Sequence, residues 1–171
     1  IRVREAYAAA SRKTGVEWRG RQYDRRKWAG TDDVNKALSC ANSCLYGIVH
    51  AAILSAGYSA GLGFIHTGKQ LSFVYDISDL YKTELTIPLA FEIVAGGGGP
   101  LERQTRLACR DRFRAARLLE RILPDIAWVL NTEEDPQAEV LDTDAAHPGR
   151  LWDPDLPGGV EGGQSYGPDV A

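Results

Sequence analysis

The chain has 171 residues, of which 44% are apolar and 25% are charged, and its formal net charge is −3 at pH 7. This length fits one globular domain with an additional tail, and the apolar content is ordinary for such a core. The cysteines number three and lack zinc-ribbon spacing, which argues against a structural zinc site and favours reduced, buried thiols in a cytoplasmic protein.

Apolar periodicity and helix-end signals predict an all-α, bundle-like body with few strand signals. Gly15 is placed to close the first helix, Thr31 to cap the second, and Pro124 to begin the last. The predicted helices cover residues 2–13, 31–55, 71–82, 88–95, 101–123 and 124–130.

The longest apolar stretch, residues 37–56, covers most of the predicted central helix. Polar side chains such as Asn42 and His50 interrupt it, and a membrane span normally avoids that many polar groups. We expect a core helix of the bundle. His50 is a rival metal ligand, although a hydrogen-bonded core histidine is the commoner case.

A small set of potential metal ligands occurs in residues 61–79, where His66 follows a glycine-rich run and precedes Asp76 and Asp79. Residues three apart on a helix share a face, so both carboxylates can reach one point, and a histidine on the preceding loop can close the site. Such donors suit Mg²⁺ or Mn²⁺ better than a structural zinc. The alternative is a solvated helix face beside a structural histidine.

Arginines dominate the predicted helix over residues 101–123. Six of them fall in a band about 80° wide on a continuous helix: Arg103, Arg106, Arg110, Arg114, Arg117 and Arg121. A solvated face paired with Glu102 and Glu120 is the alternative, but two acids do not balance six arginines. We favour phosphate contacts, and we expect Asp111 to point toward the apolar side.

The segment over residues 18–28 alternates basic and aromatic side chains, among them Tyr23 and Trp28. Bases stack on aromatic rings while cations hold phosphates, so such a segment is able to contact nucleic acid. A basic surface turn around an aromatic cluster is the alternative.

Charge is divided unevenly along the chain. Residues 1–130 carry 19 basic and 13 acidic side chains, a balance of +6, whereas residues 131–171 carry ten acids and one base, a balance of −9. The tail is rich in Pro, Gly and Asp, which predicts disorder or ordering against a partner. The split indicates a nucleic-acid-binding body with an acidic appendage.

Several motifs together resemble one known family. The stretch over residues 43–82 (SCLYGIVHAAILSAGYSAGLGFIHTGKQLSFVYDISDLYK) is similar to the core of the CRISPR-associated adaptation integrase, the endonuclease that inserts new spacers, with type I-E the nearest branch. RQYDRRKW, IPLAFEI and RLACRDRF, which begin at Arg21, Ile87 and Arg106, match in the same order. The resemblance covers residues 2–130, the expected catalytic domain, and leaves the tail over 131–171 unmatched.

The resemblance implies a metal-dependent transesterification in prokaryotic antiviral defence. His66 and Asp79 would be ligands of Mg²⁺ or Mn²⁺, with Asp76 in the same acidic site. Expected partners are a homodimer, a small ferredoxin-like adaptation protein, and DNA that joins the CRISPR repeat through its 3′ ends. The residues matched to substrate or active-site contacts are Tyr23, Trp28, Tyr46, Lys69, Tyr75, Lys82, Arg103 and Arg106, to which the arginine stripe adds Arg110.

The resemblance also implies missing parts. The family has a metal-binding glutamate about two residues upstream of the position of Ile1, and a β-rich domain before it. We therefore expect a C-terminal helical portion of a longer protein. The alternative function is a catalytically silent module that binds DNA and protein.

Overall fold

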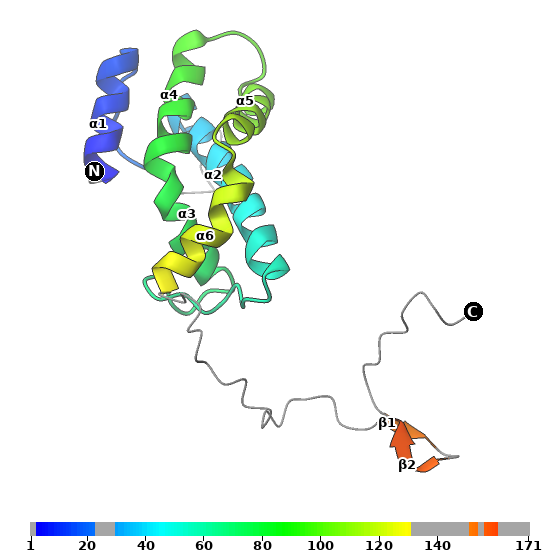
Figure 1. Ribbon diagram of the computed structural model, residues 1–171. Coiled ribbons are helices and arrows are strands. Elements are labelled where there is room, and N and C mark those ends of the chain that lie inside the picture. The colour runs from blue at the N-terminus through cyan, green and yellow to red at the C-terminus, as the bar shows by residue number, and fades with distance from the viewer. Residues whose placement is uncertain (1–2, 23–29, 131–150, 154–155, 161–171) are drawn as a thin grey trace. The chain divides into compact units, whose positions relative to one another are not determined.

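The computed structural model describes residues 3–22, 30–130, 151–153 and 156–160, and it divides the chain into two compact units, 1–133 and 134–171. Every regular element described in the first unit is a helix, which confirms the predicted all-α body (Figure 1). Its elements are α1 (Val3–Thr14), α2 (Asp33–Ser55), α3 (Ser72–Tyr81), the π-helix η2 (Lys82–Thr86), α4 (Ile87–Gly96), α5 (Leu101–Ala115) and α6 (Leu118–Leu130).

Helix α2 is the centre of the first unit and contacts α3, α4, α5 and α6. Its N-cap lies one residue later than expected, at Asp32, whose carboxylate accepts from the Asn35 N–H at 2.8 Å. By length and composition α2 is able to span a membrane. In the structure several of its apolar side chains, such as Leu38, Leu45 and Ile53, are fully buried against the other helices, as expected of a core helix.

Two apolar clusters share α2 between them. The larger one packs α2 against α3, α5 and α6 around residues such as Leu45, Ile77 and Ile122. The smaller one packs α1 against α2 and α4 around Phe91, on whose ring Trp18 lies at 5.6 Å. The division leaves α3 and its preceding loop attached to the larger cluster, which fixes the position of the candidate site.

Helices α3 and α4 are joined without a break by the π-helix η2. The sequence analysis predicted separate helices over 71–82 and 88–95, and Pro88 does lie in the first turn of α4. A π-helical turn widens the backbone and is frequent at functional sites. Here it begins at Lys82, three residues after Asp79.

The prediction of one long helix over residues 101–123 is wrong in its end point. Helix α5 stops at Ala115, and Arg117 adopts a left-handed conformation with φ of 49° before α6 begins at Leu118. Pro124 lies inside α6 instead of starting it. The turn directs the buried side chains of α6, among them Ile122 and Ile126, into the core, and that burial outweighs the cost of about 3 kcal/mol that proline carries inside a helix.

One hydrogen bond fastens α6 to α3. Tyr81 is 1% exposed, and its hydroxyl donates to Asp125 Oδ2 at 2.6 Å. Burial, followed by this bond to a carboxylate, raises the pKa of Tyr81 above its ordinary value of 10.0. Arg121, 5.4 Å over the Tyr81 ring, forms a two-bonded ion pair with Glu84 and lowers the pKa of that carboxyl.

We expect Tyr81→Phe to lower the free energy of unfolding by about 2 kcal/mol at neutral pH, because a hydrogen bond to a charged acceptor is lost. A raised folded-state pKa gives stability that is complete below pH 10 and lost as the pH rises further. The difference between wild type and variant should therefore shrink above pH 10 in urea unfolding. Tyr58→Phe is the matched control, because the Tyr58 ring packs on Phe73. An equal loss of stability in this variant would show that the hydrogen bond from Tyr81 to Asp125 has no specific contribution.

The second unit contains a two-stranded antiparallel sheet that the sequence analysis did not anticipate. Strands β1 (Leu151–Asp153) and β2 (Leu156–Val160) pair with Leu151 opposite Val160 and Asp153 opposite Leu156. Pro and Gly within β2 depress its strand propensity, so composition alone favoured irregular structure.

Candidate active site

A single carboxylate organises the loop before α3. Asp76 Oδ2 accepts from the backbone N–H groups of Phe64 at 2.6 Å and Ile65 at 3.0 Å. Its Oδ1 accepts from the His66 N–H at 2.9 Å and contacts His66 Nδ1 at 2.6 Å. The side chain of Asp76 is completely buried, so these four contacts replace water as its hydrogen-bond partners.

Burial would by itself raise the pKa of the Asp76 carboxyl, but the hydrogen bonds from Ile65, His66 and Phe64 outweigh it and lower the pKa. The group is therefore an anion at neutral pH and acts only as an acceptor. A neutral His66 ring then keeps its proton on Nδ1, and the lone pair lies on Nε2.

Gly63 makes this arrangement possible. A Cβ built on it would lie 2.3 Å from the His66 carbonyl oxygen and 2.8 Å from Asp76 Oδ2. The loop backbone therefore passes against the carboxylate at a distance that only glycine permits.

The aromatic ring of Tyr75 joins His66 to other predicted site residues. It lies 5.7 Å from the His66 ring and 5.1 Å from the Tyr46 ring, both in edge contacts, and Lys69 Nζ lies 5.9 Å from its centre. Tyr46 comes from α2, and its approach to Tyr75 depends on the packing of α2 on α3. Sequence spacing alone carries no signal for that pairing.

Lys82 connects the same cluster to Asp79. Its Nζ lies 2.5 Å from Asp79 Oδ1 and 4.9 Å from the centre of the Tyr46 ring. Burial would lower the pKa of Lys82, but hydrogen bonds with Asp79 and Tyr46 outweigh it and raise the pKa, so the ammonium stays charged. Contacts therefore run without interruption through seven predicted residues, which we call the His66 cluster: Tyr46, His66, Lys69, Tyr75, Asp76, Asp79 and Lys82.

The geometry favours a role for Asp76 that differs from direct ligation. A carboxylate has about four lone-pair positions, and four N–H or ring nitrogen contacts already occupy those of Asp76. Asp76 then orients His66, in the manner of a carboxylate that holds a metal-ligating histidine. The side chains of His66 and Asp79 are 35% and 43% exposed, which leaves them accessible.

Within the described residues, no three His, Cys, Asp or Glu side chains form a group that could hold a metal ion. The donor types of His66 and Asp79, one imidazole nitrogen and one carboxylate, do fit Mg²⁺ or Mn²⁺. The described part of the chain thus supplies two donors of a fitting type.

The remaining residues predicted to contact DNA are Tyr23, Trp28 and three arginines of the predicted stripe. Tyr23 and Trp28 lie outside the described residues. Arg103, Arg106 and Arg110 are exposed on α5. The break before α6 removes Arg121 from the expected stripe and directs it to Glu84.

The acids that neutralise these arginines also differ from expectation. Asp111, expected on the apolar side, is 65% exposed and bonds to Arg110 at 2.8 Å. Glu120 pairs with Arg117, and Glu102 lies 3.9 Å from Arg106. Such exposed pairs contribute little to stability, and they leave the guanidinium groups available to a polyanion.

Comparison with known proteins identifies the family to which this chain is similar. Residues 5–98 match the family model described as CRISPR associated protein Cas1. A CRISPR-associated endonuclease Cas1 of Thermus thermophilus is 52% identical over 174 residues, which cover 99% of this chain and 52% of that protein. The Escherichia coli K12 relative with the same description is 49% identical over 133 residues, which cover 78% of this chain and 44% of that protein.

Solved structures give the same result. The crystal structure of a TtCas1–DNA complex superposes with a TM-score of 0.71 and 55% identity, and the match covers 76% of this chain and 48% of that one. The chain thus spans about half the length of the relatives that it matches.

Proposed function

Because this chain belongs to the CRISPR-associated Cas1 family, we propose that it forms the helical half of a divalent-metal-dependent DNA endonuclease and integrase of CRISPR adaptation. The observation that carries the proposal is the His66 cluster, in which Asp76 orients a histidine beside two tyrosines, two lysines and the carboxylate of Asp79. Cations and donors for a metal ion are the groups that phosphoryl transfer uses.

His66, through Nε2, and Asp79 are the side chains that would hold Mg²⁺ or Mn²⁺. Such an ion, when bound, stabilises negative charge on the phosphodiester oxygens. Asp76 keeps the proton of His66 on Nδ1 and so keeps Nε2 available. A glutamate upstream of Ile1, which the family resemblance implies, would complete the set.

The cationic residues of the cluster would hold the DNA. Lys82 is paired with Asp79 and lies 4.9 Å from the centre of the Tyr46 ring, and the exposed Lys69 lies 5.9 Å from the centre of the Tyr75 ring. Fixed charges stabilise the extra charge of phosphoryl transfer without reorganisation. In the proposed reaction a DNA 3′-hydroxyl forms a new phosphodiester at the CRISPR repeat, the original 3′ P–O bond breaks, and the leaving 3′ oxygen takes up a proton.

Water in place of the 3′-hydroxyl gives nuclease activity by the same route. We further propose the partners that the family resemblance implied: duplex DNA with 3′ ends, a second copy of the protein, and the small ferredoxin-like adaptation protein, all in the prokaryotic cytoplasm. The crystallised relative named with DNA supports the first of these.

The test is a titration of Mn²⁺ and Mg²⁺ with two readouts, nicking of a branched DNA and joining of a short DNA to a repeat. It uses this chain and a longer form that carries the upstream glutamate. We expect the longer form to join DNA only with the ion. Joining by the longer form in the presence of a chelator would reject the metal-dependent reaction.

The second candidate function, a catalytically silent DNA- and protein-binding module, is favoured by the incomplete ligand set among the described residues. In the same titration a silent module binds DNA without nicking it at any concentration of the ion. Activity of the chain alone would remove this candidate.

A further inference from the structure

Three cysteines lie together where α5 packs on α2. Cys40 and Cys44 come from α2 and are half-buried, whereas Cys109 comes from α5 and is 1% exposed. Cys44 packs against the apolar cluster that contains Cys109, and the Cys40 thiol donates to the carbonyl oxygen of Glu102 at 3.5 Å. The packing of two helices therefore gathers thiols that are distant in sequence.

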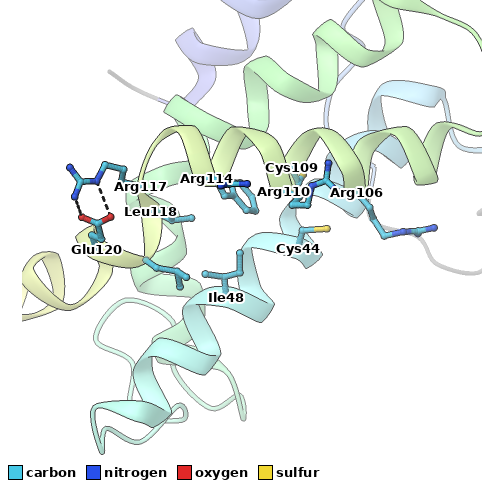
Figure 2. Close-up of a pocket in the computed structure, with 11 residues that line it drawn as sticks. Cys44, Ile48, Arg106, Cys109, Arg110, Arg114, Arg117, Leu118 and Glu120 are labelled. Atoms are coloured by element: carbon cyan, nitrogen blue, oxygen red, sulfur yellow. Dashed lines mark hydrogen bonds and ion pairs between the residues drawn. The ribbon is translucent and has the colours of Figure 1, made fainter.

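Two of these thiols line a pocket of about 420 Å³ between α2 and the junction of α5 and α6 (Figure 2). Its volume falls within the range of about 300–1,000 Å³ that is usual for small-ligand sites. Its apolar lining consists of Cys44, Ile48, Cys109, Phe113, Leu118 and Leu119. Because Cys109 is almost completely buried and Cys44 is not, a small reagent in the pocket reaches Cys44 first.

The charged lining of this pocket is mainly basic. It consists of Arg106, Arg110, Arg114, Arg117 and Glu120. Glu120 is paired with Arg117, and the acids that pair with Arg106 and Arg110 do not line the pocket. A cleft lined by charges of one sign raises the local concentration of the opposite ion by about 10-fold or more at low salt. The pocket should therefore favour anionic reagents.

Geometry selects Cys44 and Cys109 as the pair that can form a disulfide. A disulfide needs Cβ atoms about 3.5–4.5 Å apart. Cys40 and Cys44 are four residues apart on α2, and helix geometry holds such Cβ atoms about 5–6 Å apart. Cys44 and Cys109 belong to different helices, and their thiols are near enough to interact.

The buried thiols are protonated at neutral pH. Burial, followed by the neighbouring Cys44, raises the pKa of Cys109 to about 12, and burial also raises the pKa of Cys40. Thiolates are the species that attack disulfides, so Cys109 reacts slowly with a reagent in solution. Once Cys44 carries a mixed disulfide, attack by Cys109 is intramolecular, and its effective concentration is high.

We propose that this pocket is a thiol–disulfide exchange site, in which an anionic low-molecular-weight disulfide oxidises Cys44 and Cys109 to a disulfide that joins α2 to α5. Cys44 loses its proton to water and attacks one sulfur of the reagent RSSR, which forms Cys44–S–S–R and releases RS⁻. Cys109 then loses its proton to water and attacks the Cys44 sulfur, which forms the Cys44–Cys109 bond and releases the second RS⁻. Each RS⁻ takes up a proton, so the protein loses two hydrogen atoms and the reagent is reduced to two RSH.

The test uses the reduced chain and two small disulfides of opposite charge, anionic dithiodipropionate and cationic cystamine. Mass spectrometry of the intact chain follows the loss of two hydrogen atoms, and peptide mapping identifies the linked cysteines. Each rate is divided by the rate of the same reagent with the chain unfolded in urea, which removes differences in intrinsic reactivity. We expect a normalised rate roughly 10-fold higher for the anion at low salt, and no preference at about 1 M salt.

Cysteine variants identify the order of the steps. Cys109→Ala should stop the reaction at the mixed disulfide of Cys44, because the second thiol is gone. Cys40→Ala is the matched control and should form the Cys44–Cys109 bond at the unmodified rate. Thermal unfolding establishes that each variant is folded. The oxidised chain should melt roughly 5–10 °C higher than the reduced chain, because the bond closes a long loop.

The arginines are tested separately. Replacing both Arg110 and Arg114 by Gln should reduce the preference for the anion at least about threefold, because the local concentration of the anion falls. Arg12→Gln on α1, outside the pocket, should leave the preference unchanged.

Three results would overturn the proposal. If the bond does not form, or forms only as fast as the chain unfolds globally, the thiols are core side chains that the reagent does not reach in the folded protein. A disulfide that includes Cys40, or one that joins two copies of the chain, would place the reactive pair elsewhere. Equal normalised rates for the two reagents at low salt would remove the selection of anions by the pocket.

Discussion

Asp79→Ala should reduce metal-dependent DNA joining at least 100-fold in the longer form that carries the upstream glutamate. The substitution removes one of the two accessible donors that are proposed to hold the ion, and loss of a ligand would remove both the affinity for the ion and its placement. Stability should change by less than about 1 kcal/mol, because Asp79 is 43% exposed and its ion pair with Lys82 is largely screened by water. Joining rates, Mn²⁺ affinity and urea unfolding together separate the two effects.

The matched control is Asp33→Ala. Asp33 forms an ion pair with Lys36 at the same i,i+3 spacing, also with an exposed carboxylate, but it stands at the start of α2. Its loss should leave joining within about twofold and cost a few tenths of a kcal/mol through the helix dipole. Near-normal joining by Asp79→Ala would reject Asp79 as a ligand, and equal losses in both variants would indicate a general electrostatic effect.

Gly63→Ala should destabilise the protein by about 2–3 kcal/mol, because a methyl group has no space between the His66 carbonyl oxygen and Asp76 Oδ2. The nearest atom, at 2.3 Å, belongs to backbone, so the loop itself must move. That movement separates His66 from Asp76, and we expect joining to fall roughly 10- to 100-fold as the histidine loses its orienting partner.

Gly47→Ala provides the comparison, because a Cβ at Gly47 meets nothing within 4 Å and the residue is exposed in the middle of α2. Alanine there should stabilise the helix by up to about 1 kcal/mol and leave activity unchanged. The measurements are urea unfolding and the joining rate. Wild-type stability in Gly63→Ala would show that the loop has another conformation available, and the argument from close packing would then be wrong.

Local signals in the sequence were sufficient for most helix ends. Gly15, with φ of 72°, and Gly57, with φ of 80°, follow α1 and α2 where a left-handed residue ends a helix. The capping prediction missed by one residue, because Thr31 and Asp32 both favour that position and only the bond to the Asn35 N–H distinguishes them. These features depend on neighbours within one turn, which the sequence displays directly.

Pro124 misled the sequence analysis for a physical reason. Proline is a start signal in isolation, but α6 obtains its stability from buried side chains such as Leu118, Ile122 and Ile126 and tolerates the missing N–H. The true break, at Arg117, carries no glycine and so gave no signal. It also shortened the arginine stripe to the residues of α5.

The sequence by itself determined the helical class, the family and the identity of the residues in the His66 cluster. Periodicity, helix-end signals and motifs are local patterns, so they can be identified directly in the sequence. Only the tertiary structure decided which of those residues contact one another. Asp76 became the group that orients His66, Tyr46 of α2 met Tyr75 of α3, and an arginine-rimmed pocket formed between α2 and α5. Each of these depends on contacts between elements distant in sequence, and such contacts are set by packing of the whole core.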